Sequence, residues 1–452
     1  MLIASSYGVE IRKENLCFRK TFDVYRGAVS FLTFVLDSVW EELGTIGNAK
    51  KRFNTAEHMV HNTKKNRALF DFDSRFPKMP SYLRRAAIQH ALGAVSSYRT
   101  RLLQWEKVRT SSASKTHAGK KNGRPSLQGD NHAMPVFYRD VMYQAGEEGT
   151  DCAKLKLYDG RDWVWRTVRL KHTDLEYLRK HWKGKEASAP TLERRHRKYF
   201  LRFTFTEDVK LSEKPAERQT VCAVDLGINT DAVCSIMRSD GTVLARRFIN
   251  FPGEKDRMKH VLGRIRRFQR EQGTSETGGR WAYAVRLNEE LSKKTADAIV
   301  RFAEEHGADV IVFEYLDMKG KIRGRRKQRL HLWRKRDVQK RCEHLAHRKG
   351  IRVSRVCAWG TSALAFDGSG RVERDPQNHS LCSFSTGKQY NCDLSASYNI
   401  GARYLIRELI KPLPETARSL LEAKVPAVKR RTSCVYADLL RLREAMEGEG
   451  AA

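Results

Sequence analysis

Acidic residues are scarce in this chain. The 452 residues include 53 Asp and Glu against 86 Lys and Arg, which gives a net charge of +33. A merely solvated surface explains scattered charge, but it does not explain an excess of one sign this large. The imbalance favours a long polyanion as the partner, and nucleic acid is the class that fits best.

Long apolar runs and a regular cysteine pattern are also missing. No apolar run reaches the roughly 20 residues of a membrane-spanning helix. The N-terminal stretch MLIASSYGVEIRKEN lacks the apolar core of a signal peptide. The nine cysteines are an odd number without a disulfide framework, so we expect reduced thiols. Together these absences predict a cytoplasmic protein.

The stretch 220–235 has the sequence of a buried strand that ends on a carboxylate. The apolar run TVCAV leads to Asp225, Gly227 permits a sharp turn, and DAVCSIM resumes as a second strand. The tetrapeptide SDGT at 239–242 then indicates a tight hairpin before a third strand. An acid at the end of a central strand, followed by a hairpin, is how an RNase H-like sheet begins.

Two later stretches supply further acids. ADVIVFEYLDM (308–318) is an apolar strand that carries Glu314, where an unpaired charge is costly. Asp393 stands just ahead of a small-residue helix in YNCDLSASYNIGARYL. One alternative is that the three acids are unrelated and cap turns and helices. Their order and their strand-end or helix-start positions favour a set of hard oxygen ligands for Mg²⁺ or Mn²⁺, formed by Asp225, Glu314 and Asp393.

The segments around these acids resemble a known family. VDLGINTDAV, IVFEYL and CDLSASYNIGARYL are similar to the three RuvC motifs of TnpB, the RNA-guided nuclease of insertion-sequence transposons, and of the compact type V CRISPR effectors. The resemblance is specific from about residue 220 to 405 and only architectural before that. It implies a prokaryotic, nucleoid-associated nuclease in which Arg374 acts on the scissile phosphate.

The family usually carries a zinc ribbon between the second and third motifs, and this chain departs from it. The positions of the four thiolates fall on Ala365, Gly368, Cys382 and Ser385. One thiolate cannot hold a tetrahedral ion, so we expect a zinc-free hairpin packed through Phe366, Leu381 and Phe384. A different zinc site remains open, built from Cys357, His379, Cys382 and Cys392.

The expected fold is α+β and multidomain. A wedge-like β-barrel with an inserted helical recognition domain precedes an RNase H-like (RuvC) α/β nuclease domain. The expected boundaries are 1–20 and 116–212 for the wedge, 21–115 for the helical insertion, 213–356 and 393–410 for the nuclease, 357–392 for the degenerate zinc-ribbon-like insertion that binds target nucleic acid, and 411–452 for the tail. The tail is either an ordered packing helix or a flexible RNA-binding segment.

Several groups of basic residues have the spacing expected of nucleic-acid contacts. We predict helices over 25–43 and 81–108, with the basic residues of the second facing outward, and a basic helix over 255–271. A basic loop follows Glu314. A solvated face is the alternative for each group. The candidate contacts are Arg84, Arg85, Arg264, Arg266, Arg267, Arg270, Lys319, Arg323, Arg325 and Arg326.

The resulting interpretation is an RNA-guided DNA endonuclease. A guide RNA pairs with target double-stranded DNA beside a short flanking motif, one strand is displaced, and a single metal-dependent site cleaves. Two alternatives remain: an RNA-guided repressor without cleavage, and an RNase H-like transposase or resolvase. Whether the guide comes from a transposon end or a CRISPR array is left open.

Because the +33 charge is expected to act on phosphates, binding to nucleic acid should weaken steeply with salt. If several phosphate contacts form, affinity should fall by about 10³ between 50 and 200 mM salt. Fluorescence anisotropy titrations over that range measure the slope. A flat response would show that the basic surface serves another purpose.

Overall fold

The computed structural model describes residues 1–12, 16–110, 123–127, 132–147, 149–195, 197–227, 229–274, 277–315, 335–378, 380–430 and 432–450. They form two compact units, which we call the N-terminal unit (residues 4–207) and the C-terminal unit (residues 1–3 and 208–452). The described strands form four sheets, so the fold is mixed α/β as predicted. None of the described helices is both long and apolar enough to cross a membrane.

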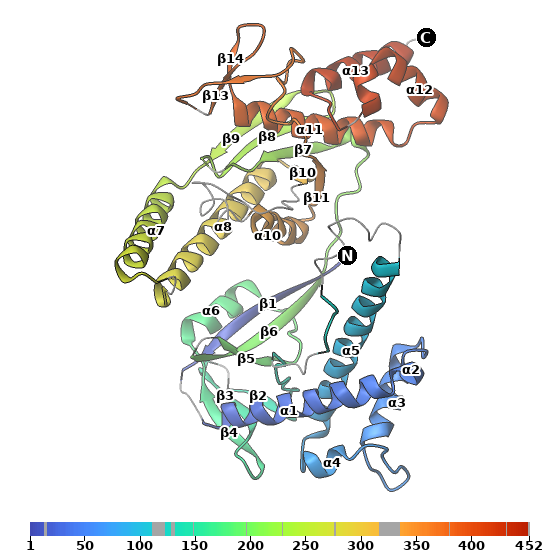
Figure 1. Cartoon of the computed structure of the whole chain (residues 1–452), viewed down its shortest axis with the longest axis vertical. Helices are drawn as coiled ribbons and strands as arrows, with labels where there is room; N and C mark the ends of the chain where they lie inside the picture. The colour runs from blue at the N-terminus through green and yellow to red at the C-terminus, as the bar shows by residue number, and fades with distance from the viewer. Residues whose placement is uncertain are drawn as a thin grey trace. The chain divides into compact units, whose positions relative to one another are not determined.

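The N-terminal unit builds one hydrophobic core from helices and two small sheets (Figure 1). Its helices are α1 (Leu16–Ser38), α2 (Trp40–Leu43), α3 (Ala49–Val60), α4 (Phe72–Arg75), α5 (Ser81–Thr110) and α6 (His172–His181). Its strands, ordered β1-β6-β5 and β2-β3-β4, are β1 (Leu2–Ile11), β2 (Tyr143–Ala145), β3 (Cys152–Tyr158), β4 (Trp163–Arg169), β5 (Thr191–Arg195) and β6 (Lys198–Asp208).

The expected wedge barrel is not found as a closed barrel among the described strands. A barrel requires every edge strand to find a partner, whereas the described strands form two three-stranded sheets with isolated bridges such as Ile11↔Leu170 between them. The helix predicted over 25–43 is α1, which begins already at Leu16, followed by α2. The helix predicted over 81–108 is α5.

The C-terminal unit contains a five-stranded sheet of order β11-β10-β7-β8-β9. Strands β8 and β9 follow β7 as an antiparallel meander, and β10 and β11 join on the other side of β7 in parallel. The strands are β7 (Thr220–Asp225), β8 (Ala232–Arg238), β9 (Val243–Ile249), β10 (Val310–Tyr315) and β11 (Arg352–Cys357).

Helices cover both faces of this sheet (Figure 1). Because side chains alternate along a strand, Val221 and Ala223 of β7 pack in the cluster that contains α11 (Cys392–Ile410). Cys222 and Val224 pack in the opposite cluster, with α8 (Gly279–Glu305) and α10 (Lys335–Arg348). The basic helix predicted over 255–271 is α7 (Pro252–Gln272), which packs on α8.

The C-terminal segment is an ordered part of this unit. Its helices α12 (Glu415–Lys424) and α13 (Tyr436–Gly450), with the 3₁₀ turn η3 (Pro426–Arg430), contribute to the same core as α11. The Tyr436 backbone N–H donates to the Asn399 side chain at 3.0 Å. Of the two possibilities left open for the tail, the packing helix is the one present.

The insertion before α11 is a small three-stranded sheet of β12 (Glu373–Arg374), β13 (Leu381–Ser383) and β14 (Gln389–Asn391). Cys382, Phe384 and Cys392 are buried together beneath it, and Phe366 packs edge-on against Phe384 at 5.6 Å. Leu381 is 36% exposed, so the expectation that it packs here is wrong. His379 lies outside the described residues.

Burial raises the pKa of the Cys392 thiol to about 12 and raises the pKa of Cys382 as well. Zinc is bound by thiolates. Because a raised pKa disfavours the thiolate, this environment favours both cysteines as neutral thiols that pack in the small core. That the insertion holds no zinc stays a prediction.

Removing the Phe384 ring should lower the free energy of unfolding by about 3 kcal/mol, because the ring is buried and Phe384→Ala leaves a cavity. Leu381→Ala, on the exposed side of the same hairpin, should cost no more than about 0.5 kcal/mol. Urea unfolding followed by tryptophan fluorescence compares the two variants. Equal losses would contradict the packing described here.

Candidate functional site

Asp225 and Glu314 lie side by side at the carboxyl edge of the central sheet. Strands β7 and β10 are parallel, and their register runs from Val221↔Val310 to Val224↔Phe313. The next pair in that register is Asp225 and Glu314. Every second side chain of β7 and β10 lies on the face that α11 covers, and Asp225 and Glu314 occupy the next such positions. Asp225 is only 8% exposed and Glu314 only 7%.

The direction of α11 brings Asp393 to the same edge. The Tyr404 hydroxyl donates to the Gln219 side chain, just before β7, at 2.9 Å. From Tyr404 back to Asp393 the helix spans about 16 Å, and from Gln219 to Asp225 the strand spans about 20 Å. Asp393, in the first turn of α11, therefore stands level with the ends of β7 and β10. The structure thus brings the three predicted acids to one sheet edge.

A buried threonine holds the Glu314 carboxylate. The Thr361 hydroxyl donates to Glu314 Oε1, and the Thr361 carbonyl accepts a 3.0 Å hydrogen bond from the Asn399 side chain of α11. The Gln339 side chain of α10 donates to the Glu314 backbone carbonyl at 2.9 Å. Glu314 is therefore fixed at both its backbone and its side chain.

Arg403 is a site-supporting residue that the sequence analysis missed. Its guanidinium is buried and donates to the carbonyls of Cys357 (2.7 Å) and Trp359 (2.8 Å). These bonds fix the loop between β11 and Thr361. Burial lowers the pKa of Arg403, and the nearby Glu314 carboxylate acts in the opposite direction. The only sequence signal was an arginine among small and apolar residues in SYNIGARYLI.

Arg374 lies on β12, opposite Cys382 of β13. Its exposed side chain donates to the Ser362 carbonyl at 3.3 Å. The charges of Arg374 and Asp393 both act on the Cys382 thiol, with opposite effects on its pKa. This shared neighbour places the predicted arginine close to the start of α11, where Asp393 lies.

The chemistry of these residues fits a divalent cation. Asp225, Glu314 and Asp393 offer hard carboxylate oxygens, and two carboxylates buried on adjacent strands repel each other unless a cation accompanies them. In the described part of the chain, no three His, Cys, Asp or Glu side chains converge closely enough to form a metal site by themselves. Water or substrate oxygens would complete the coordination, as Mg²⁺ prefers.

The predicted nucleic-acid contacts divide into three groups. Arg264, Arg266, Arg267 and Arg270 are exposed on α7, away from the buried contact with α8. Arg85 is half-exposed, but Arg84 is buried between Glu57 and Asp73, so the expectation that it faces outward is wrong. The remaining four, Lys319, Arg323, Arg325 and Arg326, lie outside the described residues.

Replacing Thr361 by valine removes the hydroxyl that holds Glu314 while it keeps the side-chain volume. A hydrogen bond to a charged group contributes about 1.5–3 kcal/mol, so any reaction that depends on Glu314 should slow by about tenfold or more. Thr361→Ser keeps the donor and should retain most of the rate. Phosphodiester cleavage assays compare the two; equal rates would show that the hydroxyl does not position Glu314.

The comparisons with known proteins cover both halves of the chain. The Aq_aa04 family model matches residues 5–159, and no curated protein matches. Among solved structures, the chain is similar to a Cas12f1–sgRNA–target DNA complex (16% identity, 88% of this chain, 98% of that chain, TM-score 0.31). It is also similar to CasPhi-2 (Cas12j) bound to crRNA (10% identity, 89% of this chain, 98% of that chain, TM-score 0.46).

The C2c1 protein of Alicyclobacillus acidoterrestris with single-guide RNA is a third similar structure (11% identity, 82% of this chain, 65% of that chain, TM-score 0.42). These solved structures are Cas12 effectors, and their sequence identity to this chain is low.

Proposed function

We propose that this chain is an RNA-guided DNA endonuclease with a single RuvC-like site. One observation carries the proposal: Asp225 and Glu314 are buried on adjacent parallel strands, on the face covered by α11, whose first turn contains Asp393. The strand order β11-β10-β7-β8-β9 supports the proposal. In this sheet β7, β8 and β9 form an antiparallel meander, and β10 and β11 add parallel strands beside β7. The RNase H-like interpretation requires a sheet of this kind.

Each side chain has a distinct part in this proposal. Asp225, Glu314 and Asp393 hold Mg²⁺ or Mn²⁺, which supplies Lewis-acid stabilisation and an activated water when bound. Thr361 orients the Glu314 carboxylate, and Arg403 is a positioning residue that fixes the loop carrying Thr361. Arg374, exposed near Asp393, offers a cation to the scissile phosphate.

The partners in this proposal are a guide RNA, the target double-stranded DNA and the displaced single strand. The net charge of +33 supports polyanion binding. The four exposed arginines of α7 add to this, because they have no ion-pair partner among the described residues. Base pairing with the guide then supplies the sequence specificity that phosphate contacts lack. We extend to this chain the guide RNA and target DNA that the Cas12f1 structure contains.

Two buried carboxylates at opposite ends of β10 give a matched test of the site. Glu314→Ala should abolish cleavage, by at least about 10²-fold, and leave guide-dependent DNA binding nearly intact. Asp309 instead accepts hydrogen bonds from Ser212 (2.8 Å) and the Thr220 backbone (3.0 Å). Asp309→Ala should therefore cost about 2 kcal/mol of stability while the folded protein still cleaves.

The measurements are plasmid cleavage with copurified guide RNA, filter binding and chemical denaturation, on Asp225→Ala as well as the two variants above. EDTA should stop the wild-type reaction, and Mg²⁺ or Mn²⁺ should restore it. Cleavage retained in both Asp225→Ala and Glu314→Ala would overturn the assignment of the site.

A further inference from the structure

The loop between α3 and α4 is basic, exposed and held in one conformation. Residues 61–70 read HNTKKNRALF and contain no acid. Thr63 and Asn66 exchange backbone hydrogen bonds of 2.8 and 3.2 Å, and the Asn66 side chain donates to the His58 carbonyl at 2.7 Å. Lys64 and Lys65 remain exposed at the tip. A loop already ordered by its own hydrogen bonds loses little entropy when it binds a partner.

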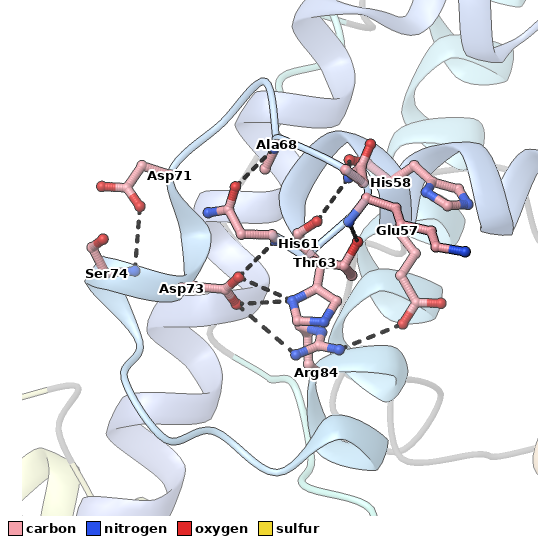
Figure 2. A network of polar contacts seen from close by, with 12 residues as sticks. Glu57, His58, His61, Thr63, Ala68, Asp71, Asp73, Ser74 and Arg84 are labelled. Carbon is pink, nitrogen blue, oxygen red and sulfur yellow. Dashed lines mark hydrogen bonds and ion pairs between the residues drawn. The ribbon is translucent and has the colours of Figure 1, made fainter.

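A hollow of about 400 Å³ lies beside this loop, between α3 and the first turn of α5. Figure 2 shows Arg84 between Glu57 of α3 and Asp73 of α4, with the His61 ring next to Arg84 and facing the same Asp73 carboxylate. The His61 ring forms a 2.9 Å hydrogen bond with Asp73, so the Asp73 carboxylate is shared between His61 and Arg84. The hollow is lined by Glu57, His58, His61, Thr63, Ser81, Tyr82, Arg84 and Arg85.

The hydrogen bonding of Arg84 in the hollow is incomplete. Arg84 is only 9% exposed, its distances to Glu57 and Asp73 are 3.7 and 3.9 Å, and its buried Nε has no hydrogen-bond partner among the described residues. Arg85, beside it, shares Glu57 at 3.7 Å. Glu57 and Asp73 are therefore shared among Arg84, Arg85 and His61, and none of the three guanidinium–carboxylate distances is short enough to be a hydrogen bond.

The start of α5 adds to the positive potential. The first backbone N–H groups of a helix lack intrahelical acceptors and carry the positive end of its dipole. The first turn of α5 contains no acid and continues into Arg84 and Arg85. Cations at a helix N-terminus are unfavourable unless an anion lies close to them. Glu57 and Asp73 are such anions but make no hydrogen bond to Arg84 or Arg85 at these distances, whereas a phosphate suits both guanidinium and N–H donors.

We propose that this hollow and the loop 61–70 together hold the phosphodiester backbone of a nucleic-acid strand. One phosphate occupies the hollow against Arg84, Arg85 and the Thr63 hydroxyl, and the following phosphates meet Lys64, Lys65 and Arg67. Tyr82, half-exposed and packed on Tyr138 at 4.9 Å, presents a ring on which a neighbouring base can stack. This inference rests on the proposed function, because it assigns a strand-binding site to the proposed endonuclease.

The test replaces the accessible cations and leaves Arg84 in place, because Arg84 is buried and forms ion pairs with both Glu57 and Asp73, so its removal would disturb the packing of α3, α4 and α5. The site variant is Lys64→Ala/Lys65→Ala/Arg85→Ala. The matched control is Lys50→Ala/Lys51→Ala/Arg101→Ala, which removes the same charges from exposed positions at the far ends of α3 and α5. Thermal unfolding verifies that both full-length variants fold.

Binding is measured by anisotropy as a function of salt, with a fluorescein-labelled DNA duplex and a fluorescein-labelled RNA hairpin as separate probes. Each lost phosphate contact lowers the slope of log K against log salt by about 0.9 on duplex DNA and by about 0.7 on single strands. The site variant should therefore lose about 2 from the slope on at least one probe and bind it at least about tenfold more weakly. The control variant should lose much less.

Loss on the DNA duplex alone assigns the site to target DNA, and loss on the RNA hairpin alone assigns it to the guide. If the wild type binds both probes and the site variant behaves like the control on each, this inference fails and the proposed function stands. If the wild type binds neither probe, the proposed function fails, and this inference fails with it.

Discussion

The close approach of α11 to the central sheet is the constraint on which the C-terminal unit depends. A Cβ at Gly401 would stand 2.5 Å from the Met237 sulfur and 3.1 Å from the Ala223 Cβ, so the helix can lie this close only because residue 401 has no side chain. At this separation Asn399 reaches Thr361 and Arg403 reaches the loop after β11. The same contact fixes how far α11 extends past β7, and therefore where Asp393 stands.

The two acids near the ends of β10 have different surroundings. Asp309 is buried, and its oxygens are taken up by Ser212, Lys214 and the Thr220 backbone, so it ties the segment before β7 to the sheet. Glu314 is buried to the same degree, and among the described residues its carboxylate receives one hydrogen bond, from the Thr361 hydroxyl, with the charge of Arg403 nearby. An anion with a single hydrogen bond to its carboxylate in a low-dielectric site is costly. That cost is understandable if the carboxylate serves a cation.

Local signals in the sequence were sufficient for β7 and its turn. The apolar run ends at Asp225, and a Cβ at Gly227 would lie 2.4 Å from the Thr230 carbonyl, which is why glycine marks that turn. Arg84 could not be placed in this way. Its burial depends on Glu57 and Asp73, which belong to other helices, and a helical pattern read along 81–108 contains no information about them. Arg403 was missed for the same reason.

Aromatic packing orients the insertion before α11. Phe366 contacts Phe384, Tyr390, Tyr398 and Tyr436, at ring distances of 5.6, 4.9, 5.3 and 6.0 Å. These rings belong to the hairpin, to α11 and to α13, so one aromatic cluster joins three elements that are separate in the sequence. The hairpin pairs β12 with β13 in a register that sets Arg374 against Cys382. Since Asp393 follows the buried Cys392 directly, the same cluster holds the predicted arginine near the third acid.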